Sequence, residues 1–164
     1  WHKSSRPQSL IADALKTTFH QCLQPSVAMI AMVVMSLIMN DSGMTSTIAV
    51  SLAGATGAAY PLISPFIGVL GCFMTGSNAS SNVMFGSLQT GAAAVLGISP
   101  LVIASVQSIG GSLGASIAPA KVLLGSTAAG MGGREAEILR KTLIYCSLAA
   151  LLVGLLCWLV VKIF

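Results

Sequence analysis

The feature that most constrains this fold is a polar octapeptide, TGSNASSN, that lies between two short apolar segments. The octapeptide covers residues 75–82, and residues 61–74 and 83–97 flank it. Built as α-helices, the two flanks would be about 21 Å and 23 Å long, whereas the hydrocarbon core of a bilayer is about 30 Å thick. Neither flank can cross a membrane alone, so the octapeptide would join two half-length helices.

Composition places the chain in a membrane. Hydrophobic residues make up 55% of it, charged residues only 7%, and the mean hydropathy is +0.90. A soluble domain carries roughly 25% charged residues, so this chain cannot cover a water-facing surface. The 17 glycines favour a bundle of several helices, because small residues let helix backbones approach closely in lipid. Since the chain begins at Trp1 and not at Met, we expect an N-terminal part of the same protein to complete the fold.

The two flanks fit a re-entrant helical hairpin over residues 61–98, with its tip near 75–82. Pro61 and Pro65 open the first arm, and Gly76 can end it. Non-helical backbone at membrane depth is tolerated only where it is buried in protein or lines an aqueous cavity. The tip is therefore predicted to be a binding site.

Residues 99–132 predict a discontinuous helix. A continuous helix of about 31 residues would be about 46 Å long, too long for one span. Gly110, Gly111, Gly114 and Pro119 lie near its middle, which predicts a break near residues 108–119. Paired interrupted segments are a sequence indication of a transporter's binding site.

The remaining chain divides into four predicted parts: a basic amphipathic interfacial segment (1–24), an interrupted transmembrane segment (25–60), a cytoplasmic basic loop (133–141) and a C-terminal transmembrane helix (142–164). We expect the chain to turn into the membrane at Pro25 and to be interrupted near Asn40–Gly43. Placing both basic parts in the cytoplasm requires an even number of crossings between them, which this layout satisfies. Two full spans in place of the hairpin also give an even number, so the short arms are what favours the hairpin.

The breaks carry residues that suit a small anion. A helix that starts deep in a membrane presents unpaired N–H groups and the positive end of its dipole, which attract carboxylates. The side-chain hydroxyls at the breaks, and the backbone carbonyls that an unwound turn leaves free, would also suit Na⁺. Helix capping and helix packing explain the serine and asparagine residues equally well. The candidate substrate-binding residues are Thr75, Gly76, Ser77, Asn78, Ser80, Ser81, Asn82, Gln107, Ser108, Gly110, Gly111, Ser112 and Lys121.

Two charged residues stand out in this apolar chain. Asp41 lies either at a membrane boundary or inside the membrane, where a charge is costly and marks function. Lys121 reaches an interface, pairs with Asp41, or binds a substrate carboxylate. The candidate ion-coupling residues are Asp41 and Asn78.

Two short motifs resemble those of enzymes, but neither is accompanied by the other residues that the enzyme motif requires. The stretch Gly110–Gly114 matches G-x-S-x-G, but no histidine follows His20, which argues against an intramembrane serine hydrolase. Gly125–Gly130 resembles a phosphate loop, but Met131 replaces its lysine. The four cysteines have no ligand or disulfide spacing. We expect no enzyme activity, no cofactor, no metal and no nucleic-acid partner.

The run GVLGCFMTGSNASSNVMFGSLQTGAAAVLGISPLVIASVQSIGGSLGASIAPAKV resembles the C-terminal part of the bacterial L-lactate permease family. The resemblance extends through MNDSGM and GGREAEILRKTL. It implies a polytopic inner-membrane carrier for lactate and glycolate, usually regarded as a proton symporter. A weaker resemblance to ion-transporter-type carriers implies a re-entrant hairpin and elevator-type movement.

The chain departs from the family pattern at two positions. The pattern often has aspartate at Asn78 and glutamine at Lys121. The first departure removes a titratable group from the tip, and the second adds a positive charge near the second break. One interpretation is that charge has moved from ion coupling towards carboxylate binding.

We therefore expect an all-α, multi-pass protein of the bacterial inner membrane. Its predicted function is cation-coupled symport, with H⁺ as the favoured cation, of L-lactate, D-lactate and glycolate. The alternatives are a Na⁺-coupled carboxylate carrier and a non-transporting packing or sensor module. The expected partners are the carboxylate, the cation, the bilayer and the N-terminal part of the protein, and a homo-oligomer is left open.

Overall fold

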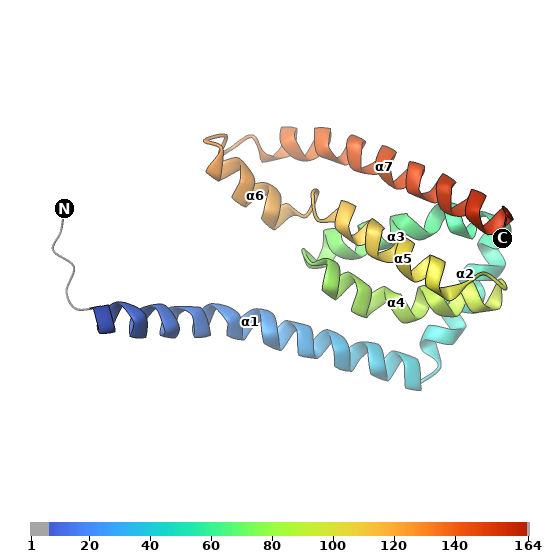
Figure 1. The fold of residues 1–164 in the computed structure, drawn as a ribbon, viewed down its shortest axis with the longest axis horizontal. Helices are drawn as coiled ribbons and strands as arrows, with labels where there is room; N and C mark the ends of the chain where they lie inside the picture. The colour runs from blue at the N-terminus through green and yellow to red at the C-terminus, as the bar shows by residue number, and fades with distance from the viewer. Residues whose placement is uncertain (1–6, 164) are drawn as a thin grey trace.

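The computed structural model describes residues 7–163, and every regular element in that range is a helix (Figure 1). The elements are α1 (Pro7–Asp41), α2 (Met44–Thr56), the 3₁₀ turn η1 (Gly57–Ala59), α3 (Tyr60–Thr75), α4 (Asn78–Val95), α5 (Pro100–Gly114), α6 (Pro119–Ala128) and α7 (Glu135–Ile163). The predicted all-α class is confirmed.

The connection between α3 and α4 is only two residues long. Helix α3 ends at Gly76, whose φ of 72° is the left-handed conformation that glycine adopts without strain. Ser77 then caps α4 by accepting a hydrogen bond from the backbone N–H of Ser80 at 3.3 Å. The octapeptide is thus largely helical, because its serine and asparagine side chains start α4 within two residues of the end of α3.

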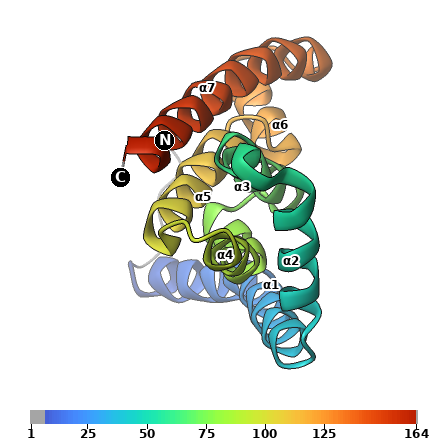
Figure 2. The same cartoon turned by 90° about the vertical axis from the view of Figure 1, so that its right-hand side faces the viewer.

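Helix α4 is the central element of the bundle. Seen end-on in Figure 2, it is surrounded by α1, α2, α3 and α5, and it packs against all four. Helices α3 and α4 run antiparallel, and α5 lies against both (Figure 1). The polar start of α4 therefore faces protein, and not only lipid or water.

Glycines bring α3 and α5 into backbone contact. A Cβ atom on Gly114 would lie 2.5 Å from the carbonyl oxygen of Val69, and one on Gly110 would meet the carbonyl oxygen of Pro65. This is the close approach that small residues permit between helices in a membrane. Gly110 and Gly111 were expected to unwind the helix, but they lie inside α5, and the break follows them.

The break between α5 and α6 covers residues 115–118, and the two helices are bent by 41° relative to each other. Pro119 begins α6, because a proline is tolerated in the first turn of a helix, where its missing N–H costs nothing.

Helix α1 differs from our expectation at Pro25, where it continues without a turn and ends only at Asp41. A proline inside a helix removes one hydrogen bond at a cost of about 3 kcal/mol, and the turns on either side can hold the helix together. Of the predicted basic segment, Lys3 and Arg6 lie outside the described residues. Its interfacial location stays a prediction.

Two helical stretches in the described residues are long and apolar enough to cross a membrane, Met44–Thr75 and Glu135–Ile163. The bent pair of α5 and α6 would be a third if it forms one span. The first stretch joins α2 to α3 through η1, whereas the sequence analysis placed residues 61–74 in a hairpin arm. The re-entrant arrangement therefore stays a prediction.

Candidate functional site

Two asparagine–serine hydrogen bonds join the start of α4 to α5. Asn78 Nδ2 donates to Ser112 Oγ at 2.9 Å, and Asn82 Nδ2 donates to Ser108 Oγ at 3.3 Å. In each helix the two residues are four apart, so they lie on one face. The structure thus brings the predicted tip against the predicted facing residues of the discontinuous helix. We call these two contacts the Asn–Ser pairs.

The same asparagines each carry an oxygen without a partner. Asn78 Oδ1 and Asn82 Oδ1 are buried and accept no hydrogen bond within the described residues. A Cβ atom on Gly111 would lie too close to Asn78 Oδ1, so a larger residue there would force the Asn78 side chain to move. A buried polar group left unsatisfied costs about 1–3 kcal/mol, which marks this contact as unusual for a helix–helix interface.

Ser81 and Gln107 lie beside these pairs but belong to a buried network. Ser81 Oγ donates to the carbonyl oxygen of Gly68 at 3.0 Å, and Gln107 Nε2 donates to Ser81 Oγ at 3.1 Å. The residues are 0% and 1% exposed, respectively. Both were predicted to bind substrate, but here they tie α3, α4 and α5 together.

The network continues through Gln89, which the sequence analysis did not single out. Gln89 Nε2 donates to Gln107 Oε1 at 2.5 Å and to the carbonyl oxygen of Ser64 at 2.9 Å. Its Oε1 accepts from Tyr60 Oη at 2.8 Å and from Ser64 Oγ at 2.7 Å. All its polar atoms are satisfied, as buried polar groups require. The one sequence signal for this role was a glutamine inside the otherwise largely apolar second arm of the predicted hairpin.

The remaining residues of the tip shape its turn. Thr75 Oγ1 donates to the carbonyl oxygen of Gly71 at 2.8 Å and to that of Ser77 at 3.0 Å. Ser80 is buried, and its backbone N–H is the group that Ser77 caps. These contacts fit the capping alternative better than direct substrate contact.

Lys121 and Asp41 are not brought together. Lys121 is exposed in the first turn of α6, whereas Asp41 is the last residue of α1, and the end of α1 lies away from α6 (Figure 1). Neither takes part in an ion pair among residues 7–163. Lys121 is therefore free to meet a ligand or the membrane surface.

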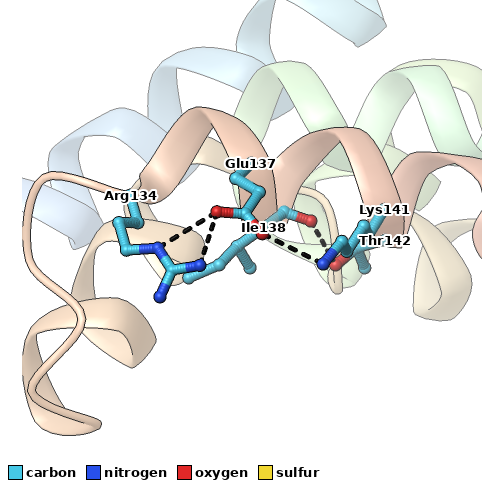
Figure 3. Close-up of polar contacts among 5 residues, drawn as sticks. All are labelled: Arg134, Glu137, Ile138, Lys141 and Thr142. Carbon is cyan, nitrogen blue, oxygen red and sulfur yellow. Dashed lines mark hydrogen bonds and ion pairs between the residues drawn. The ribbon is translucent and has the colours of Figure 1, made fainter.

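The ion pairs found in the described part of the chain gather at the start of α7 (Figure 3). Arg134 Nη2 lies 2.7 Å from Glu137 Oε2, and Lys141 Nζ lies 3.0 Å from Glu137 Oε1. Glu135 Oε1 accepts from the backbone N–H of Gly133 at 2.9 Å. Exposed ion pairs of this kind contribute little to stability, and these two lie along the start of α7 without forming a site.

Within the described residues, no group of three or more His, Cys, Asp or Glu side chains converges that could hold a metal ion.

An apolar groove lies on another face of α3. It is lined by Phe66, Ile67, Val69, Leu70, Phe73, Ile117, Leu143 and Ser147. Such a lining suits hydrocarbon and not a carboxylate, so the Asn–Ser pairs are the better candidate site.

Comparison with known proteins shows which protein family the chain is similar to. The family model described as L-lactate permease matches residues 4–164. The chain is 40% identical over 121 residues to glycolate permease GlcA of Escherichia coli K12, covering 74% of this chain and 21% of that protein. It is 34% identical over 148 residues to the L-lactate permease of the same strain, covering 88% and 27%. The L-lactate permease of Bacillus subtilis 168 is 33% identical over 144 residues, covering 88% and 25%.

The chain therefore spans only about a fifth to a quarter of the length of these relatives. No solved structure matches it.

Proposed function

The chain belongs to the L-lactate permease family, and from that premise we propose that it is part of a secondary active transporter for lactate and glycolate. The relatives are named as permeases, which are transporters and not enzymes. The proposed substrates are small 2-hydroxymonocarboxylates: L-lactate, D-lactate and glycolate. The proposed location is the bacterial inner membrane, which the chain would cross several times, with its N-terminal part completing the carrier.

The observation that carries this proposal is the contact between the start of α4 and α5. It combines a helix N-terminus, two neutral amides and two serine hydroxyls, with two buried oxygens that lack partners. Neutral hydrogen-bond donors near a helix N-terminus can hold a carboxylate without a fixed charge. A tight apolar packing contact would not need unsatisfied amides, so the non-transporting alternative is less favoured.

We propose that α3 and α4 form a re-entrant hairpin whose tip stops within the membrane. In support, the two helices are antiparallel, each is short of the bilayer thickness, and two residues connect them. The bent pair α5–α6 would be the facing discontinuous helix. An elevator-type movement of this unit would carry the site across the membrane.

Coupling to H⁺ is the favoured proposal, and coupling to Na⁺ is the alternative. The residues 75–82 and 107–112 include no acidic side chain. A coupling proton would thus travel with the substrate carboxylate, on Asp41, or on the remainder of the protein. Na⁺ would instead use hydroxyl and carbonyl oxygens, which the tip offers.

Uptake by the full-length protein in proteoliposomes tests the proposal. Radiolabelled lactate and glycolate are supplied with an imposed pH gradient or Na⁺ gradient. Accumulation driven by the pH gradient alone supports H⁺ symport, and accumulation driven by Na⁺ supports the alternative. Absence of uptake of either acid, with protein shown to be folded, would overturn the carrier proposal and favour the packing or sensor module.

A further inference from the structure

In each of the two Asn–Ser pairs, only one of the two polar atoms of the asparagine amide has a hydrogen-bond partner. In each pair the asparagine donates through Nδ2, and in each pair its Oδ1 is buried without a donor. The asparagines are one helical turn apart on α4, so the two oxygens repeat along the same seam against α5. The seam therefore holds two buried acceptors that no donor of the described residues reaches.

Helix α5 presents no donor to Asn78 Oδ1. The residue against this oxygen is Gly111, which has no side chain. The hydroxyl hydrogen of Ser112 is directed to the carbonyl oxygen of Ser108 at 3.0 Å. The two asparagine oxygens therefore remain available to a ligand that carries a donor.

A 2-hydroxycarboxylate carries the complementary groups. Its hydroxyl donates a hydrogen bond, and the carboxylate on the adjacent carbon accepts one. An asparagine amide presents an acceptor and a donor on one carbon atom. When a pair opens, the freed Nδ2 can donate to the carboxylate while Oδ1 accepts from the hydroxyl. A 2-oxo acid or an unsubstituted acid fills only the first of these contacts.

We propose that Asn78 and Asn82 are specificity-determining residues that recognise the 2-hydroxyl group of the substrate through their Oδ1 atoms. This inference rests on the proposed transport function and adds the basis of its selectivity. Because the oxygens are covered, the substrate reaches them only after the start of α4 separates from α5. Recognition and opening of the tip are then the same event.

The expected selectivity is large. A site built to bond a hydroxyl rejects an analogue that lacks it, because the buried acceptor is then left unpaired. We expect glycolate to compete with labelled lactate about ten- to a hundredfold more strongly than acetate or pyruvate does.

The test is competition by these three acids in proteoliposomes of the full-length protein, for wild type, Asn78→Ala, Asn82→Ala and the control Ser105→Ala. Ser105 is exposed on α5, and its hydroxyl donates only to Leu101 within its own helix. The alanine variants should lose the preference for glycolate, because the hydroxyl acceptor is gone, and should bind every acid more weakly, because the Nδ2 donor to the carboxylate is gone too. Ser105→Ala should keep both the preference and the affinity. A wild type without the preference, or alanine variants that retain it, would overturn the proposal.

If an alanine variant fails to insert into the membrane, the variants Asn78→Asp and Asn82→Asp test the proposal instead. Each keeps an oxygen acceptor for the hydroxyl while it replaces the Nδ2 donor, so the preference for glycolate over acetate should be preserved. A lost preference would contradict the proposal. Loss of Na⁺-dependent uptake with intact selectivity would do the same and would assign the oxygens to a cation. Absence of all transport by folded wild type would instead reject the proposed function.

Discussion

The side chains of Gln89 and Gln107 are hydrogen-bonded to each other at 2.5 Å in the interior of the bundle, and neither is more than 1% exposed. This contact joins α4 to α5, and the bonds of Gln89 to Tyr60 and Ser64 add α3. Three helices are thus held by one amide pair, beside the Asn–Ser pairs but not part of them.

Replacing Gln89 with leucine should destabilise the protein by about 2–4 kcal/mol, because it leaves several buried polar groups without partners. Thermal unfolding of the detergent-solubilised protein would show the loss as a lowered Tm. Ser87→Ala, at an exposed position of the same helix, is the control. An unchanged Tm for Gln89→Leu would contradict the network's structural role.

Replacing Gly111 with alanine should reduce uptake at least tenfold. The added methyl group would lie too close to Asn78 Oδ1, so the Asn78 side chain would have to turn away and would lose its hydrogen bond to Ser112. Gly86→Ala is a matched control in the middle of α4, where a Cβ atom meets nothing within 4 Å. That control should transport normally and gain up to about 1 kcal/mol of helix stability. Equal uptake by the two variants would refute the close contact at Gly111.

Cysteine labelling should distinguish Ser112 from Ser81. Ser112 is exposed, so Ser112→Cys should react with a membrane-impermeant maleimide and be protected by lactate. Ser81 is 0% exposed, and Ser81→Cys should react slowly or not at all. The readout is the ratio of the two labelling rates. If Ser81→Cys instead reacted faster than Ser112→Cys, the buried network around Ser81 would have to face water.

Replacing Lys121 with glutamine should raise the lactate concentration needed for half-maximal uptake several-fold, if its free charge attracts the substrate carboxylate. The effect should shrink at high ionic strength, because exposed charges are screened. Lys162→Gln, an exposed charge at the end of α7, is the control. Identical kinetics at low salt for wild type and Lys121→Gln would exclude this role.

The sequence alone predicted the all-helical class, a turn at Gly76 and a break within residues 108–119, since chain length, glycine and proline act locally. The break covers only residues 115–118, because Gly110, Gly111 and Gly114 stay helical within α5. The sequence did not predict the continuity of α1 through Pro25, because a long helix tolerates one lost hydrogen bond. It did not indicate that Ser81 and Gln107 are hydrogen-bonded to each other inside the bundle, and their contact with substrate stays a prediction. Residue type indicates which chemistry is possible, but which helix a side chain faces depends on packing between distant segments.

The glycine contacts between α3 and α5 have a consequence for how this segment tolerates mutation. At Gly68, Gly110 and Gly114 the nearest atoms to an added Cβ belong to the backbone, and backbone cannot move aside as a side chain can. In a saturation-mutagenesis library these three codons should accept almost no substitution. Many of the surrounding leucines and isoleucines, which face outwards, should exchange freely for one another. The least replaceable positions of this segment are then the ones with no side chain at all.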